Sequence, residues 1–181
     1  MPNWCQNVAT FSHTDPAMME KLDEAINNNQ LFNTFFPTPF ELNDSRAHSW
    51  GGHFAKEQDQ LRETLRQKYG YENGNDWRNG EWGTKWDACE LCRRDDCDDK
   101  SVTVQFDTAW SPPTNFYDKM VDIGFTVNAL YYEGGCCFCG RYDDSGDTYY
   151  QWNDIETAMK TIPVDIDEEF NIIGTISDWE E

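Results

Sequence analysis

The stretch Ser101–Glu133, SVTVQFDTAWSPPTNFYDKMVDIGFTVNALYYE, decides the fold. Its first ten residues are rich in β-branched and aromatic side chains and predict a strand, as does FTVNALYYE at its end. Between them, Ser111 followed by Pro112 predicts a helix start, and Gly124 predicts its C-terminal cap. Apolar residues at helical spacing predict its inner face: Phe116, Tyr117, Met120 and Val121. The stretch therefore predicts consecutive strand, helix and strand.

Similar signals precede this stretch. Residues 3–12, NWCQNVATFS, predict a strand, and Asp15 before Pro16 predicts the capped start of a helix. KWDACEL, residues 85–91, predicts another strand, which RRDDCDDK would connect as a turn to the strand at residue 101. The resulting order is strand, helix, strand, strand, helix, strand. It predicts an α+β fold, the ferredoxin-like β-α-β-β-α-β arrangement with an antiparallel sheet.

Residues 31–84 interrupt this order and predict a helical and loop insertion. LFNTFFPTPFEL is expected to be an aromatic loop, because Pro37 and Pro39 oppose regular structure. Residues 53–69 predict a helix by their apolar spacing. GYENGNDWRNGEWG, residues 70–83, is expected to be irregular because it is rich in glycine and asparagine.

The region after residue 133 predicts additional strands and a short helix. GG followed by CCFCGRY is a hairpin signal, and TYYQW extends the strand-rich region. Asn153 and Glu156 have the spacing of a capping box, which predicts a short helix to Lys160. The length predicts one domain over residues 1–181, with an acidic C-terminal segment at 143–181.

Three motifs add a family resemblance. MPNWC at the start, GTKWDA (83–88) and FDTAWSPP (106–113) resemble the YubB-type ferredoxin-like proteins of phages and plasmids. The resemblance extends over most of the chain. It implies a ferredoxin-like fold without an iron–sulfur cluster and a setting on a phage or other mobile element. It implies no catalytic residues, because the family has none agreed upon.

The charge is the strongest anomaly of the composition. The chain holds 34 acidic residues against 14 lysines and arginines, a formal net charge of −20. Residues 143–181 contain twelve of the acids and a single base, Lys160. Such charge opposes direct binding to DNA, RNA or an anionic membrane and favours a basic protein partner.

The expected location is the cytoplasm of an infected host cell. No apolar run has the roughly 18 residues of a membrane helix, and the N-terminus has no signal-peptide pattern. The seven cysteines are expected to be mostly reduced.

A metal site is the first alternative to consider for the cysteines. Cys89 and Cys92 have zinc spacing and Cys97 follows, with Cys136, Cys137 or Cys139 as a fourth ligand. The second half of the zinc pattern is absent, and buried free cysteine is common. We therefore expect no cofactor, while a zinc-stabilised domain with Cys89, Cys92, Cys97 and Cys137 remains an alternative hypothesis.

Catalysis is not expected. The histidines are His13, His48 and His53, and neither a nucleophile motif nor a phosphate-binding loop is present. With 34 carboxylates, pairs at catalytic distance arise by chance and carry no weight.

The leading hypothesis is therefore a DNA mimic that inhibits a host nucleic-acid-binding defence system, of CRISPR or restriction type. Closely spaced carboxylates on a rigid surface imitate a phosphate backbone. The expected partner-binding residues are Asp95, Asp96, Asp98, Asp99, Asp143, Asp144, Asp147, Asp165, Asp167, Glu168 and Glu169. An alternative is a non-catalytic phage accessory module that binds a protein through exposed aromatic loops, at residues 31–40 and at WRNGEW, 77–82.

Overall fold

The computed structural model describes residues 3–43, 55–94 and 100–180. Its centre is a six-stranded sheet of order β2-β3-β1-β4-β5-β6, in which neighbouring strands are antiparallel. The strands are β1 (Trp4–Ser12), β2 (Cys89–Arg93), β3 (Ser101–Ala109), β4 (Thr126–Glu133), β5 (Phe138–Asp143) and β6 (Gly146–Gln151). The first four, with two helices, form the predicted β-α-β-β-α-β unit, and β5 and β6 are the predicted additional strands. The α+β, ferredoxin-like fold is therefore confirmed.

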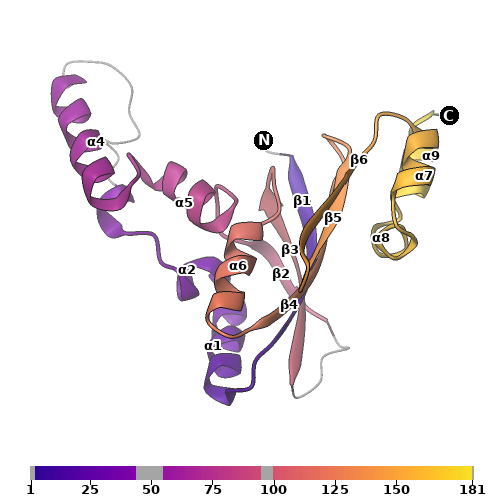
Figure 1. Ribbon diagram of the computed structural model, residues 1–181, viewed down its shortest axis with the longest axis horizontal. Helices are drawn as coiled ribbons and strands as arrows, with labels where there is room; N and C mark the ends of the chain where they lie inside the picture. The colour runs from indigo at the N-terminus through magenta and orange to yellow at the C-terminus, as the bar shows by residue number, and fades with distance from the viewer. Residues whose placement is uncertain (1–2, 44–54, 95–99, 181) are drawn as a thin grey trace.

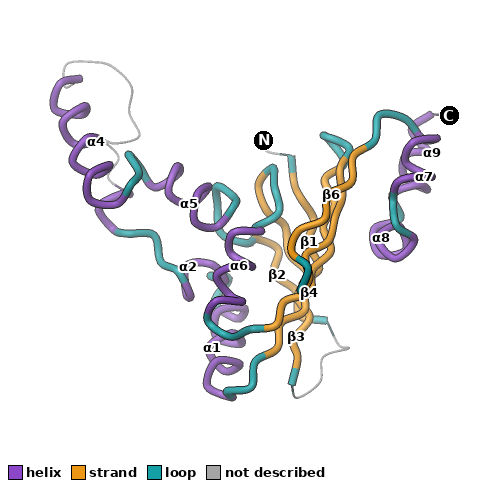
Figure 2. Tube along the Cα trace, viewed as in Figure 1, coloured by secondary structure: helices purple, strands orange, loops and turns teal. Residues whose placement is uncertain are grey.

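Helices lie on both sides of this sheet (Figures 1 and 2). On one face are α1 (Pro16–Asn27) and α6 (Thr114–Asp122), joined there by α2 (Leu31–Phe35). The short 3₁₀ helix η1 (Phe40–Asn43), α4 (Ala55–Tyr69) and α5 (Gly74–Trp82) extend away from the sheet. The chain ends on the opposite face with α7 (Ile155–Thr161), α8 (Val164–Phe170) and α9 (Ile172–Glu180).

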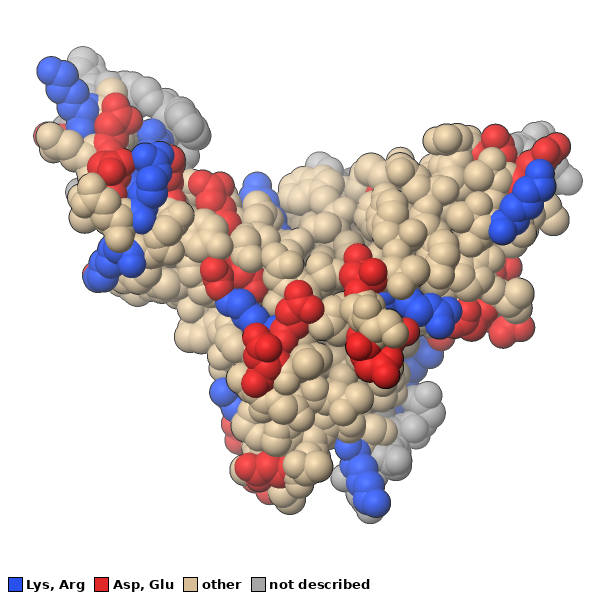
Figure 3. All heavy atoms as spheres, viewed as in Figure 1, with Lys and Arg blue, Asp and Glu red and all other residues tan. Residues whose placement is uncertain are grey.

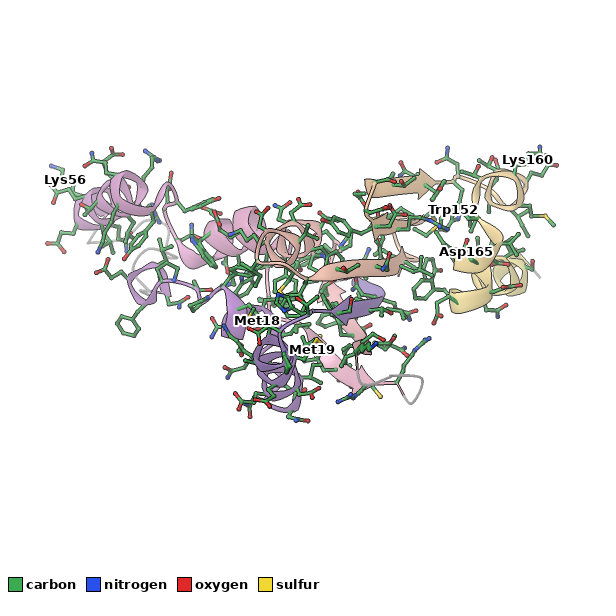
Figure 4. The ribbon with its side chains drawn as sticks, turned by 60° about the horizontal axis from the view of Figure 1, so that its bottom comes forward. Met18, Met19, Lys56, Trp152, Lys160 and Asp165 are labelled. Carbon is green, nitrogen blue, oxygen red and sulfur yellow. The ribbon has the colours of Figure 1, made fainter. Side chains whose placement is uncertain are left out.

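Alternation along the strands separates two cores. Phe11 on β1 and Phe106 on β3 are fully buried toward α1 and α6, against Phe116 and Met120. The other face carries Tyr132, which packs in a second cluster beneath α8 and α9. Figure 4 shows Trp152 of that cluster between the end of β6 and the C-terminal helices, far from Lys56 on α4. Because side chains alternate at period two, one sheet supports helices on both faces.

The prediction of an irregular aromatic loop at residues 31–42 is wrong. Leu31–Phe35 is helical, and a 3₁₀ turn covers Phe40–Asn43. Phe32 is fully buried, with its ring centroid 4.5 Å from that of Phe116. Burying these rings in the main core outweighs the local effect of the two prolines, which lie between the helical segments rather than inside them.

The prediction of an irregular connection at residues 70–83 is also wrong, since it contains α5. The Asn73 side chain caps this helix by accepting from the backbone N–H groups of Asn75 and Asp76, at 2.9 and 3.0 Å. Gly83 ends it in the left-handed conformation, with φ 86°. Here glycine and asparagine provide the caps of a helix instead of preventing one.

The start of one strand also differs from the prediction. β2 begins at Cys89 rather than Lys85, because the Asp87 carboxylate instead accepts from the backbone N–H groups of Phe32 and Asn33. This anchors residue 87 to the start of α2. The backbone N–H donors stabilise the charged carboxylate and lower the pKa of Asp87. Burial has the opposite and larger effect, so the pKa is raised overall.

Two predicted caps are replaced by neighbouring residues. Ser111 does not cap α6, since its hydroxyl donates to the carbonyl of Gly83 at 2.6 Å and the helix begins at Thr114. The short helix α7 is capped by Asp154, which accepts from the backbone N–H of Thr157 at 2.7 Å, rather than by Asn153.

Candidate functional site

Five aspartates lie at the end of the β5–β6 hairpin and on the neighbouring helix α6, and three of them, Asp118, Asp122 and Asp147, surround the Tyr142 hydroxyl. We call these residues the acidic patch: Asp118, Asp122, Asp143, Asp144 and Asp147. Figure 3 shows acidic side chains gathered over α6 and over this end of the hairpin, on the face turned to the viewer. Within the described residues, none of the five forms an ion pair with a lysine or arginine.

Two tyrosines hold the acidic patch together. The Tyr142 hydroxyl donates to the Asp118 carboxylate at 2.7 Å, and the Tyr131 hydroxyl donates to Asp147 at 2.8 Å. The pKa of Asp147 is raised by burial and also by the nearby charge of Asp118. The pKa of Tyr142 is raised by burial, by its bond to Asp118, and by the charges of Asp122 and Asp147. The patch is therefore a concentration of mutually repelling negative charge.

The four predicted acids of α8 have a different environment. Asp165 pairs with Arg141 at 2.6 Å, and Glu169 pairs with Arg94. Asp167 accepts from the backbone N–H of Ile173 at 2.8 Å, while Glu168 is exposed. The two arginines line a polar cleft of about 310 Å³ between the sheet and α8, and Asp143 of the acidic patch also lines it. Much of the negative charge of α8 is therefore neutralised within the fold.

The third predicted group, Asp95, Asp96, Asp98 and Asp99, lies outside the described residues. The structure thus places Asp143, Asp144 and Asp147 together at one end of the hairpin. It adds two aspartates of α6, Asp118 and Asp122, that the sequence reasoning missed. Their signal was their spacing of four residues on one face of the predicted helix.

Two of the cysteines of the zinc hypothesis, Cys89 and Cys137, lie far apart in the sheet. Cys89 lies opposite Asp107 on β3, while Cys139 lies opposite Tyr132 on β4. Four strand spacings separate Cys89 from the strand beside Cys137, roughly 19 Å, so these two thiolates could not bind one zinc ion. Cys97 lies outside the described residues, within which no three His, Cys, Asp or Glu side chains form a metal-binding group.

One of the three histidines, His13, lies within the described residues. His13 accepts from the backbone N–H of Asp15 at 2.9 Å, beside the start of α1, whereas His48 and His53 lie outside the described residues.

In the part of the chain that the structure describes, no helix is both long and apolar enough to cross a membrane.

The aromatic residues predicted to be exposed are mostly buried. Trp77 is 9% exposed and Trp82 is 2% exposed, and the Trp82 indole N–H donates to the carbonyl of Phe36 at 3.0 Å. Phe40, which is 91% exposed, is the exception. The interaction surface expected at residues 31–40 and 77–82 is therefore largely part of the hydrophobic core.

Three other tryptophans are exposed and adjacent instead. Trp4, Trp86 and Trp110 are 41%, 39% and 44% exposed, and we call them the tryptophan surface. The ring centroids of Trp4 and Trp86 are 6.1 Å apart, and those of Trp86 and Trp110 are 5.6 Å apart. The Lys85 ammonium lies 5.6 Å from the Trp86 centroid and 5.4 Å from the Trp110 centroid.

The fold brings these tryptophans together from three distant segments. Trp4 opens β1 and is opposite Ala109 of β3, so Trp110 follows directly beside it. Trp86 lies shortly before β2, the other neighbour of β3. Each one belongs to a motif that the sequence showed, in NWC, KWDA and AWSPP. The sequence signal that could have predicted this surface is that each tryptophan lies at or near the end of a predicted strand.

The match to a protein-family model supports the fold. A protein-family model described as the ferredoxin-like domain in Api92-like protein matches residues 81–175, more than half of the chain. The crystal structure of the protein Api92 from Yersinia pseudotuberculosis superposes with a TM-score of 0.44 and 9% sequence identity, covering 84% of this chain and 99% of that chain. No curated protein matches. The chain belongs to the family defined by the ferredoxin-like domain of Api92-like proteins.

Proposed function

We propose that this chain is a non-catalytic binding protein whose acidic face imitates the charge of a nucleic acid and occupies a basic groove of a nucleic-acid-binding protein. The observation that carries the proposal is the acidic patch, whose five aspartates form no ion pair with a lysine or arginine among the described residues. Duplex DNA carries one negative charge per roughly 1.7 Å of its axis, so a groove built for it accepts dense negative charge.

The arrangement of the patch favours this function over simple solubility. A small domain needs a net charge of only about 2–8 to remain soluble, and this chain carries −20. Asp118 and Asp147 are held close to each other by hydrogen bonds from two tyrosines, despite their repulsion. A fixed cluster of charge attracts a basic partner over long range and accelerates association.

The resemblance to YubB-type proteins suggests the setting. It favours a phage or plasmid protein that acts in the host cytoplasm, and a partner from a defence system of CRISPR or restriction type. The acidic patch would provide most of the contact, with Glu168 adding charge from α8. Asp165 and Glu169 contribute less, since Arg141 and Arg94 already pair with them.

The test is capture of a partner on the immobilised protein from a bacterial host lysate, followed by competition with duplex DNA. Capture is compared at about 0.05 M and about 0.5 M salt, which shortens the screening length about threefold. We expect capture at low salt, loss at high salt, and displacement by the duplex. A captured partner that is not displaced by DNA contradicts mimicry.

Matched variants localise the contact. Asp122→Lys/Asp144→Lys reverses two charges of the patch, and Glu24→Lys/Glu57→Lys reverses two exposed charges on α1 and α4. Both doubles change the net charge equally. We expect the patch variant to bind at least about tenfold more weakly and with a smaller salt dependence than the control. Equal affinities of the two variants would show that the patch is not the contact.

A further inference from the structure

The tryptophan surface lies on the part of the sheet that the C-terminal helices leave open. Trp4 and Gln6 of β1 are exposed there, as is Gln105 of β3. By contrast, Tyr132 and Cys139 on the same face are buried beneath α8 and α9. Exposed indoles in contact with one another are uncommon, because aromatic side chains are the largest contributors to cores and interfaces.

The backbone at this surface is strained. Trp110 has φ 65°, a left-handed conformation that bulky side chains rarely adopt. Its backbone N–H donates to the carbonyl of Asn3 at 2.9 Å, which ties it to the start of β1. Burial of the indole does not compensate for this strain, since Trp110 is 44% exposed. Such strain persists where the surrounding structure fixes a residue, often at binding sites.

Negative charge lies beside Trp4. Asp107 is opposite Gln6 in the β1–β3 register, which makes it the diagonal neighbour of Trp4 on the same face, with the two residues about 7–8 Å apart along the sheet. Among the described residues, this half-buried carboxylate forms no hydrogen bond or ion pair. Burial and the charge of Glu90 raise its pKa. A cation at this position would therefore relieve an unfavourable environment.

We propose that the tryptophan surface, with Asp107, binds an arginine side chain of a basic partner protein. A guanidinium stacks on indole faces and donates two parallel hydrogen bonds to a carboxylate, and the surface offers both kinds of partner. Lys85 demonstrates that two of the rings already attract a cation. The net charge of −20 opposes an anionic ligand, such as a single-stranded nucleic acid, on the same rings. The inference deepens the proposed function and rests on it for the source of the arginine.

The test uses two short peptides with blocked ends, one with two arginines separated by glycine and one with citrulline in place of arginine. Citrulline keeps the shape of arginine and removes its charge. Binding to the full chain is measured by calorimetry and by NMR signals of the indole N–H groups. We expect the arginine peptide to bind about tenfold or more tightly than the citrulline peptide. Equal binding of the two peptides overturns the proposal.

Variants assign the site. Trp86→Ala removes the central ring, and Phe40→Ala removes an exposed aromatic ring elsewhere as the matched control. Asp107→Asn removes the carboxylate while conserving its shape. We expect Trp86→Ala and Asp107→Asn each to weaken arginine-peptide binding several-fold, about two- to thirty-fold, and Phe40→Ala to leave it unchanged. Unchanged binding of both Trp86→Ala and Asp107→Asn contradicts the proposal.

Lys85→Met gives a result whose sign identifies the ligand class. If the ligand is a cation, removing the resident ammonium strengthens its binding. If the surface instead binds nucleic acid, Lys85→Met weakens binding of a thymidine oligonucleotide, and the proposal is overturned.

The same capture experiment distinguishes failure of the arginine site from failure of the proposed function. Loss of partner capture in Asp122→Lys/Asp144→Lys but not in Trp86→Ala refutes only the arginine site, whereas the opposite result refutes only the acidic patch.

Discussion

The β5–β6 hairpin and helix α8 are similarly acidic in sequence, yet their carboxylates have different partners in the fold. Asp165 and Glu169 on α8 face Arg141 and Arg94, which extend from the sheet and the end of β2. Asp147 of the hairpin instead lies near Asp118 of α6, and these two carboxylates and Asp122 surround the Tyr142 hydroxyl. The number of acids in a segment therefore does not determine its electrostatic potential, because the placement of a few arginines decides which charges reach solvent uncompensated.

The same contrast distinguishes stability from function. An ion pair between partly buried groups stabilises the position of α8 on the sheet, while an unpaired carboxylate contributes a field at some cost in stability. If this contrast holds, removing a charge of an α8 ion pair should lower the free energy of unfolding, whereas removing an unpaired charge of the β5–β6 hairpin should raise it or leave it unchanged.

The largest effect is expected from Arg94→Ala. The Arg94 and Glu169 side chains are 32% and 21% exposed, so the substitution leaves a partly buried carboxylate without its partner. We expect a loss of about 1–3 kcal/mol in the free energy of unfolding by urea denaturation. Lys160→Ala is the control, because Lys160 and Glu156 are 77% and 84% exposed, and it should cost less than about 1 kcal/mol. Equal losses would remove the special role of the α8 pair.

A smaller loss is expected from Asp165→Asn. This pair with Arg141 is more open, with Asp165 54% exposed, and solvent screens it. We expect a loss of up to about 1 kcal/mol at low salt that shrinks at high salt, measured by thermal unfolding. The substitution Asp144→Asn, at an exposed position of the hairpin, should not destabilise the protein. A loss of the same size at Asp144 would contradict the comparison.

The smallest effect has the opposite sign. Burial and Asp118 raise the pKa of Asp147, so the folded state favours the protonated carboxyl. Stability from this group is therefore present at acid pH and is lost as the pH rises through its folded pKa. Asp147→Asn should increase the free energy of unfolding by about 0.5 kcal/mol at neutral pH, with no gain below about pH 4. Urea denaturation across this pH range measures it, and a destabilised variant at neutral pH would contradict the assignment.

Local sequence signals predicted most of the sheet. The alternation in β1 and β3 and the Asp15 cap of α1, which accepts from the backbone N–H of Ala17 at 2.9 Å, appear as expected. The insertion was predicted less well. Its prolines, glycines and asparagines indicate loops locally, but Phe32 and Trp82 gain more by joining the core around Phe116 than the chain loses by bending.

The candidate site was predicted only in part. Asp143, Asp144 and Asp147 were identified from the density of acids, whereas Asp118 and Asp122 joined them through the packing of α6 beside the hairpin. The tryptophan surface was missed entirely. Its members are separated by up to 106 positions in the chain. Residue type also gave no indication that they are exposed, because tryptophan is highly buried on average.

The sequence by itself determined the net charge of −20, the order of strands and helices in the ferredoxin-like unit, and the motifs that hold Trp4, Trp86 and Trp110. These properties depend on composition and on periodicities within a few residues. Only the tertiary structure decided which carboxylates meet arginines and which tryptophans face solvent. Both depend on strand register and helix packing, which bring together residues distant in the chain. No local sequence pattern determines which distant residues come into contact.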